Sequence, residues 1–182
     1  NLNANQFEKE HYVFGGWKST NGRIFDDQQS VQNLTDTDGA TIILTATWKE
    51  KDYTGEPYNI ILHSNNGSDT TQEVAAEFGV NKTLPKNTFT KDHYDFKGWS
   101  SFPSNHNVIY VDEDVVKVNH PEVIGGNTLN LYAVWDIQKY TVEFINGNET
   151  ITQTIEYGST VQLPEATNKV GYTFAGWYTE SG

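Results

Sequence analysis

Three residue types that can cooperate in nucleophilic catalysis lie close together near the middle of the chain: Ser104, His106 and Asp112. An activated serine needs a base within reach and a sharp turn that exposes its hydroxyl, and no Gly-x-Ser-x-Gly sequence surrounds Ser104. The same three residue types also come together often by chance. We therefore predict that the protein is not an enzyme and has no catalytic residue.

Two acidic segments offer oxygen ligands for calcium: Asp36-Thr37-Asp38-Gly39 and Asp112-Glu113-Asp114. Neither is followed by the bidentate Glu of an EF-hand loop, so solvated acidic loops are the expectation. The histidines lie at positions 11, 63, 93, 106 and 120, with no i, i+4 pair, and the chain has no Cys and no Gly-rich phosphate loop. We predict no metal site and no cofactor.

The charge of the chain restricts its partners. Its 182 residues have a formal net charge of −12, with 12 Lys and Arg against 24 Asp and Glu. Nucleic acids and anionic membrane surfaces are bound by clusters of basic residues, and here the basic residues are scattered. No apolar run approaches the roughly 18 residues of a spanning helix. We predict no binding to nucleic acid and no membrane insertion. Because the chain lacks Met and a signal-peptide pattern, we expect it to be a piece of a longer protein.

An aromatic motif, Tyr-x-Phe-x-Gly-Trp, occurs three times. Its copies end at Trp17, Trp99 and Trp177, which are 82 and 78 positions apart. A second motif, Ala-x-Trp, follows the first two copies and ends at Trp48 and Trp135, so all five tryptophans occupy two repeating positions. The chain therefore consists of repeats of about eighty residues. The residues of the first motif are Tyr12, Phe14, Gly16, Trp17; Tyr94, Phe96, Gly98, Trp99; and Tyr172, Phe174, Gly176, Trp177.

Repeats of this length exceed the units of a solenoid, so each should close its own small core. We expect residues 1–48 to be the second part of one repeat, residues 58–135 a complete repeat and residues 140–182 the first part of another. Each partial repeat lacks strands that its other half would supply. Either these ends fray, or they complement one another between molecules, head to tail. The four-residue connection 136–139 should be stiffer than the nine-residue connection 49–57.

Alternation of apolar and polar residues predicts mainly strands. Tyr140, Val142 and Phe144 alternate with polar residues, and a second alternating segment follows the turn Asn146-Gly147-Asn148, which predicts a hairpin. In the complete repeat the second strand reads TTQEVAAEFG, whose Ala and Glu residues would also suit a short helix. The motif segments and the segments that end at Trp48 and Trp135 are the remaining predicted strands.

Strict alternation along the motif places Tyr172, Phe174 and Gly176 on one side of a strand and Trp177 on the other. A Gly inside a strand leaves room for a neighbouring ring or backbone. Aromatic side chains bury roughly 150–250 Å² each, which stabilises a small domain without disulfides. We therefore predict that the motif residues form cores and not a ligand site.

Four segments carry a family resemblance: YTVEF, IEYGSTVQLP, GYTFAGWYTESG and LYAVW. They resemble the Listeria–Bacteroides repeat, or internalin B-repeat, of bacterial surface proteins, over residues 58–135 and 140–182, with 11–48 as a partial copy. The resemblance implies an α+β, mostly β fold of tandem small β-grasp-like modules, each a mixed sheet packed on a helix or loop. It also implies an extracellular stalk at the bacterial cell surface or cell wall. The chain departs from the family pattern at His93-Tyr94, which replaces Gly-Tyr, and in the segment 102–127.

The segment 102–127 is rich in Val and Ile. It either completes the core as an extra strand, which we favour, or presents an exposed edge to a partner, with Phe102 and Tyr110 as candidate contacts. The sequence thus predicts non-catalytic spacer repeats whose partners are neighbouring repeats. The alternative is an adhesion module that binds host protein or glycan through an exposed face.

Overall fold

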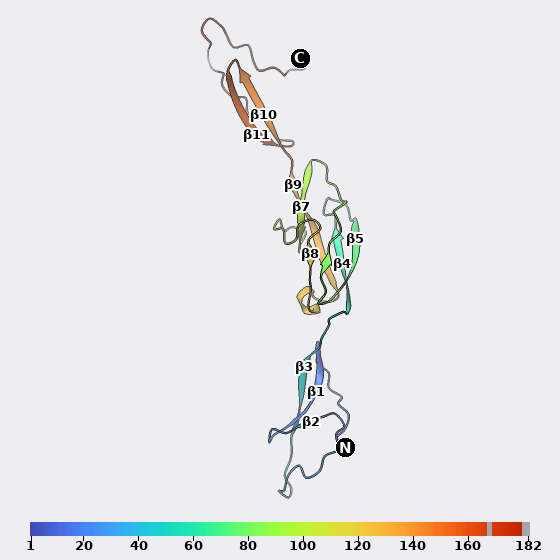
Figure 1. Cartoon of the computed structure of the whole chain (residues 1–182). Helices are drawn as coiled ribbons and strands as arrows, with labels where there is room; N and C mark the ends of the chain where they lie inside the picture. The colour runs from blue at the N-terminus through green and yellow to red at the C-terminus, as the bar shows by residue number, and fades with distance from the viewer. Residues whose placement is uncertain (167–168, 180–182) are drawn as a thin grey trace. The chain divides into compact units, whose positions relative to one another are not determined.

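The computed structural model describes residues 1–166 and 169–179, and the chain divides into two compact units, Asn1–Tyr53 and Thr54–Gly182 (Figure 1). The predicted predominance of β-structure is confirmed in both. The α component of the predicted α+β class is not confirmed, because the described residues hold one helical element, the 3₁₀-helix η1 at Pro121–Ile124.

The complete repeat is built on a four-stranded mixed sheet. Its strands are β4 (Pro57–His63), β5 (Thr71–Glu77), β7 (Tyr94–Ser100) and β9 (Thr128–Ile137), in the order β5-β4-β9-β7. The central pair β4–β9 is parallel and the two outer pairs are antiparallel. Alternate residues of the central strands make the core, as the period of a strand requires: Tyr58, Ile60, Leu62, Leu131 and Ala133 are buried.

The segment TTQEVAAEFG forms strand β5, so its helical alternative is wrong. Tyr58 of β4 lies opposite Ala76 of β5, and the pairing continues from Pro57–Glu77 to His63–Thr71. An isolated helix of this length would be marginal in water, whereas pairing with a buried strand satisfies the backbone and buries Ala76.

The segment 102–127 divides into two parts, and each predicted alternative applies to one of them. Its second part joins the core: β8 (Val115–Val116) pairs with β6 (Lys82–Thr83), and Val116 and Val118 are buried. Its first part forms no named strand: it meets β7 at an isolated bridge between Tyr110 and Trp99, and its apolar side chains Phe102, Val108, Ile109 and Val111 remain exposed.

The predicted hairpin is confirmed in the residues that follow the complete repeat. Strands β10 (Lys139–Asn146) and β11 (Glu149–Glu156) pair along their whole length around Gly147, whose φ of 63° suits the tight turn. The third motif copy was also predicted to be a strand, and that prediction is wrong: residues 172–177 pair with no strand among the described residues.

The first unit holds a three-stranded antiparallel sheet. Its strands are β1 (Tyr12–Ser19), β2 (Ile24–Phe25) and β3 (Leu44–Glu50), in the order β2-β1-β3. The pair β1–β3 reproduces the pair β7–β9 of the complete repeat, as the matching tryptophans predicted.

Candidate functional site

The motif strand contains a β-bulge that strict alternation misses. The register of β7 against β9 shifts between Phe96 and Gly98, and that of β1 against β3 shifts between Phe14 and Gly16. The extra residue turns the tryptophan back to the face of the phenylalanine. The predicted placement of Phe and Trp on opposite faces is therefore wrong: the ring centroids of Phe96 and Trp99 lie 5.0 Å apart, edge to face.

In the first two copies of the motif, the glycine lets another backbone segment come close, as predicted for a glycine inside a strand. Gly98 has a φ of +143°, and a Cβ added there would lie 2.5 Å from the carbonyl oxygen of Tyr110. At Gly16, with a φ of +109°, it would lie 2.7 Å from the carbonyl oxygen of Phe25. In the complete repeat this close approach allows the backbone N–H of Trp99 to donate to the backbone carbonyl of Tyr110 at 2.8 Å.

The tryptophans of the complete repeat are core residues. Trp99 is fully buried and Trp135 is 9% exposed. The Trp135 ring meets Phe96 at 5.5 Å, and its Nε1–H donates to the carbonyl of Ser64 at 2.9 Å. The Trp99 Nε1–H is buried without an acceptor. Burial of this kind leaves no ring face for a sugar or peptide ligand.

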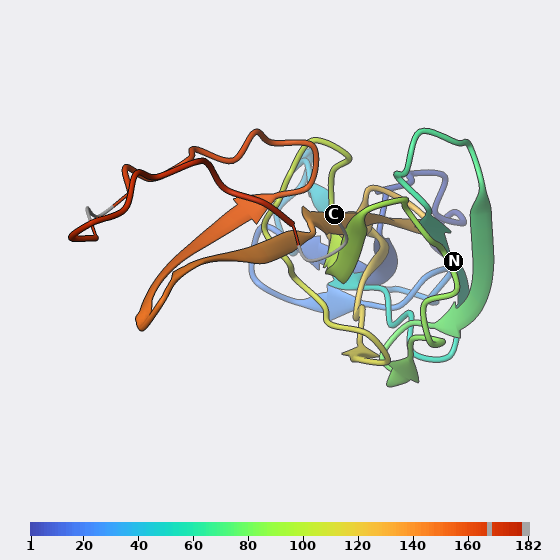
Figure 2. The same cartoon turned by 90° about the horizontal axis from the view of Figure 1, so that it is seen from above.

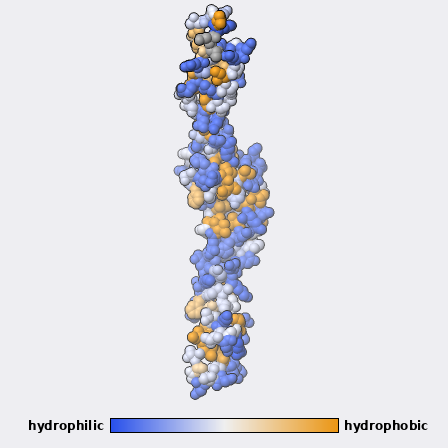
Figure 3. All heavy atoms as spheres, turned by 90° about the vertical axis from the view of Figure 1, so that its left-hand side faces the viewer, coloured by the Kyte–Doolittle hydropathy of each residue, from blue (hydrophilic) through white to orange (hydrophobic). Residues whose placement is uncertain are grey.

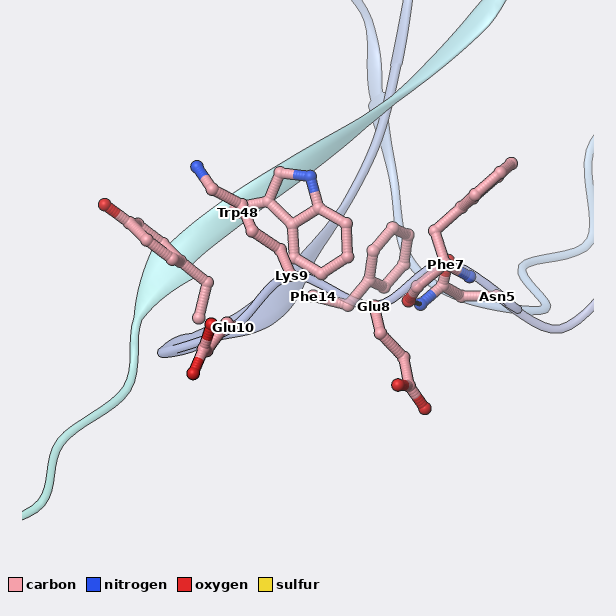
Figure 4. A pocket seen from close by; sticks show the side chains of 8 residues that line it. Asn5, Phe7, Glu8, Lys9, Glu10, Phe14 and Trp48 are labelled. Carbon is pink, nitrogen blue, oxygen red and sulfur yellow. Dashed lines mark hydrogen bonds between the residues drawn. The ribbon is translucent and has the colours of Figure 1, made fainter. Parts of the chain in front are cut away.

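The partial copies keep the ring contacts but bury them less. Phe14–Trp17 and Phe174–Trp177 have centroid distances of 5.1 and 5.3 Å. Their burial differs from that of the complete repeat: Trp17, Trp48 and Trp177 are half-buried, and Tyr172 and Phe174 are exposed. In the first unit, the rings of Phe7, Phe14 and Trp48 line a shallow pocket. Phe14 lies between Trp48 and Phe7, and the carboxylates of Glu8 and Glu10 point away from these rings (Figure 4).

A single residue, Gln138, joins the complete repeat to the hairpin β10–β11. Its backbone N–H donates to the carbonyl of His93 at 2.9 Å, and its carbonyl accepts from the Tyr157 N–H at 2.8 Å. Its side-chain amide donates to Asp95 at 3.0 Å. Because these bonds reach both sides of the junction, Gln138 restrains the hairpin against the motif strand of the preceding repeat.

His93 explains one departure from the family pattern. Its φ is 63°, the left-handed region that glycine adopts most easily, and Gly171 has a φ of 81° at the same motif position. The imidazole of His93 stacks on the ring of Tyr157, with centroids 3.3 Å apart and planes 10° apart. The side chain that replaces glycine therefore adds a contact with the next hairpin.

The first part of segment 102–127 carries an exposed apolar surface. Phe102 is 64% exposed, and Val108, Ile109 and Val111 are also exposed. Tyr110, the second candidate contact, is half-buried, and its carbonyl lies over Gly98. Apolar side chains gather in patches on the complete repeat, within a mainly hydrophilic surface (Figure 3).

The residues considered for catalysis make other contacts. Asp112 accepts a hydrogen bond from the Asn87 backbone N–H at 2.8 Å, and no hydrogen bond joins the described side chains of Ser104 and His106. Tyr58 is a core residue, and burial raises the pKa of its phenol above the ordinary value of 10.0. The Val118 backbone partly opposes this rise, but no hydrogen bond of ordinary geometry reaches the Tyr58 hydroxyl.

Comparison with known proteins identifies the family of the repeats. The sequence profile of the Listeria-Bacteroides repeat domain matches residues 58–134 and 140–182. The chain is 31% identical over 180 residues to a protein named "Putative membrane protein" from Evansella cellulosilytica, covering 95% of this chain and 23% of that protein. It is 29% identical over 108 residues to Internalin H of Listeria monocytogenes, covering 59% of this chain and 18% of that protein.

The chain thus spans less than a quarter of the length of these curated relatives. No solved structure gives a significant match. Within the described residues, no helix has the length and apolar character needed to cross a membrane.

Proposed function

This chain belongs to the Listeria–Bacteroides repeat domain family, and from that premise we propose that its repeats are non-catalytic spacers of a bacterial cell-surface protein. The names of the relatives, a membrane protein and an internalin, support a surface location. The observation that carries the proposal is the junction at Gln138, where one residue hydrogen-bonds to both the complete repeat and the following hairpin. A spacer needs joints of this kind, because a free joint would not hold a distal domain away from the surface.

We further propose that each complete repeat is a β-grasp-like module. The mixed sheet β5-β4-β9-β7, with its parallel central pair, supports this assignment. The segment between β6 and β7 takes the place of the helix. A module of this size spans roughly 30 Å, so each repeat would add about that length to the parent protein.

The junction is testable by residual dipolar couplings of the full chain. In the wild type, one alignment tensor should describe both the complete repeat and the β10–β11 hairpin. In Tyr157→Ala, which removes the stack on His93, the two tensors should diverge. Gln72→Ala, a substitution on β5 away from the junction, is the control and should change neither tensor. Two different tensors in the wild type would contradict the spacer proposal.

A second candidate function is adhesion, and the exposed apolar side chains of residues 102–111 favour it. A host-protein or glycan array would test it with the wild type and the Phe102→Ala, Ile109→Ala double variant. Loss of a bound spot in the double variant, with its thermal stability unchanged, is the expected result for adhesion. Val123→Ala is the matched control, because Val123 is 73% exposed outside this segment. An array without any bound spot would leave spacing as the function.

A further inference from the structure

The sheet of the complete repeat has two edge strands, β7 and β5, and the edge of β7 is obstructed. The bulge between Phe96 and Gly98 interrupts its register. The following segment covers the end of the strand: the Trp99 N–H donates to the Tyr110 carbonyl and the Ile109 N–H to the Trp99 carbonyl, each at 2.8 Å. Bulges and covering loops block a sheet edge against further strands. The β7 edge is therefore a poor site for strand addition.

Strand β5 forms a regular edge. Its register against β4 runs without a shift from Glu77 to Thr71, and among the described residues no strand pairs with its other side. It is the green strand at the right-hand margin of the complete repeat (Figure 2). Because β4, β9 and β7 complete the sheet on its inner side, this edge belongs to the complete repeat itself and not to a partial one.

The pairing of β5 with β4 fixes which backbone groups face outward. At one end of the ladder the Ser64 N–H donates to the Thr70 carbonyl at 2.9 Å. Hydrogen-bonded pairs alternate along an antiparallel ladder, so the even-numbered residues of β5 bond to β4. The N–H and C=O groups of Glu73 and Ala75 therefore point away from β4. These are the groups that an added strand would bond.

The side chains along this edge form two faces of different chemistry. Glu73 and Glu77 are exposed on one face, and no salt bridge within the described part of the chain involves them. On the other face Val74 is half-buried and Ala76 is buried. Residues directly opposite on neighbouring strands share a face. An added strand would thus place alternate residues beside carboxylates and beside apolar side chains.

We propose that β5 binds an extended segment of another protein, in which Lys or Arg alternates with apolar residues. The main chain of the segment bonds to Glu73 and Ala75, its basic side chains pair with Glu73 and Glu77, and its apolar side chains pack beside Val74. This interaction goes beyond the spacer role and uses a surface other than residues 102–111.

A second copy of this chain does not fit the same edge through its own β5. Residues 64–81 contain no Lys or Arg. Two β5 strands paired with their faces aligned would set the glutamates of both copies on one face, and like charges on neighbouring strands are destabilising. The formal net charge of −12 opposes such pairing further. The edge therefore selects a basic partner.

The probe is a synthetic peptide of alternating Lys and Val residues, as long as β5, added at millimolar concentration to the isotope-labelled full chain. Amide hydrogen exchange should slow at Glu73 and Ala75, whose N–H groups gain acceptors, and stay unchanged along β7. The control peptide has the same composition with its Lys and Val residues in two blocks, so that its charge is equal and its alternation is lost. No slowing, or equal slowing by both peptides, would overturn the proposal.

Ala75→Pro tests the main-chain pairing. Proline removes an N–H that points away from β4, which an edge strand tolerates, so the repeat should fold and peptide binding should disappear. Ala75→Val keeps the N–H and is the matched control, with binding like that of the wild type. Undiminished binding to an Ala75→Pro chain with native chemical shifts in β7 and β9 would contradict strand addition.

The charge pairing has its own test, which does not depend on the proline variant. Glu73→Gln combined with Glu77→Gln should weaken binding of the Lys-Val peptide about two- to thirty-fold. Glu73→Lys combined with Glu77→Lys should reverse the preference toward a peptide of alternating Glu and Val. A charge-reversed chain that still prefers the basic peptide would refute the proposal. The spacer proposal would be unaffected, because it concerns the junction at Gln138.

Discussion

The complete repeat and the partial repeat after it contain the same motif in different surroundings. Trp99 is fully buried between β9 and the segment around Tyr110, whereas its counterpart Trp177 is half-buried and Phe174 is 47% exposed. The local ring contact is nearly the same in both, at 5.0 and 5.3 Å. The motif therefore makes its own aromatic pair, but a core forms only where strands distant in sequence cover that pair.

The largest expected difference between the two copies concerns the tryptophans. Trp99→Ala should lower the free energy of unfolding of the complete repeat by about 3–5 kcal/mol, because it opens a cavity in a packed core. Trp177→Ala should cost about 1 kcal/mol, since this side chain is only half-buried. Urea titration with hydrogen exchange at the β9 and β10 amides assigns each loss to its repeat. Equal losses would mean that the third copy has a closed core.

The motif glycines should differ in the same direction by a smaller amount. Gly98→Ala should destabilise the complete repeat by about 2–4 kcal/mol, because its Cβ would meet the Tyr110 carbonyl oxygen at 2.5 Å. At Gly176 the φ is +134° and the nearest atoms, in the Tyr178 ring, are 3.9 Å from such a Cβ, so only backbone strain of about 1 kcal/mol remains. Thermal unfolding of the two variants measures the difference, and a Gly98→Ala chain as stable as the wild type would contradict the close approach.

The smallest expected difference is between Tyr58 of the complete repeat and Tyr140 at the equivalent position of the hairpin. Burial raises the pKa of the Tyr58 phenol in the folded state above 10.0, so the unfolded chain loses that proton first as the pH rises. The folded repeat should thus lose stability above about pH 10. Tyr58→Phe should remove this loss and raise stability below pH 10 by up to about 1 kcal/mol, because it deletes a buried hydroxyl without a partner.

Tyr140→Phe is the control for that measurement. Tyr140 occupies the equivalent position in the hairpin but is 43% exposed, so its substitution should leave the alkaline dependence of the complete repeat unchanged. Chemical denaturation at pH 8 and pH 10.5 compares the variants. An identical alkaline loss in the wild type and Tyr58→Phe would show that other tyrosines cause it.

Much of the fold could be predicted from spacing, because equivalent positions of the repeats can be compared within one chain. The hairpin after Tyr140 follows from alternation around Gly147, and the equivalence of β1–β3 with β7–β9 follows from the matching tryptophans. The β-bulge was missed because alternation assumes one residue per step. Its available signal was the glycine, whose freedom at positive φ is what a bulge of this kind requires.

Two features of the candidate site lay beyond sequence reasoning for a physical reason. His93 is exposed, and its stack on Tyr157, 64 positions later, depends on how the chain turns at Gln138. The division of segment 102–127 depends on which of its residues reach β6 and Gly98. Contacts of this range have no local pattern.

The sequence by itself determined the period, the β10–β11 hairpin and the equivalence of β1–β3 with β7–β9, because alternation, turn chemistry and repeated spacing can be seen without long-range contacts. Only the tertiary structure decided which copy of the motif is buried. In the sheet that contains Trp99, β4 and β9 pair in parallel across the 64 intervening residues 64–127, and the hairpin at β10 has no such partner among the described residues.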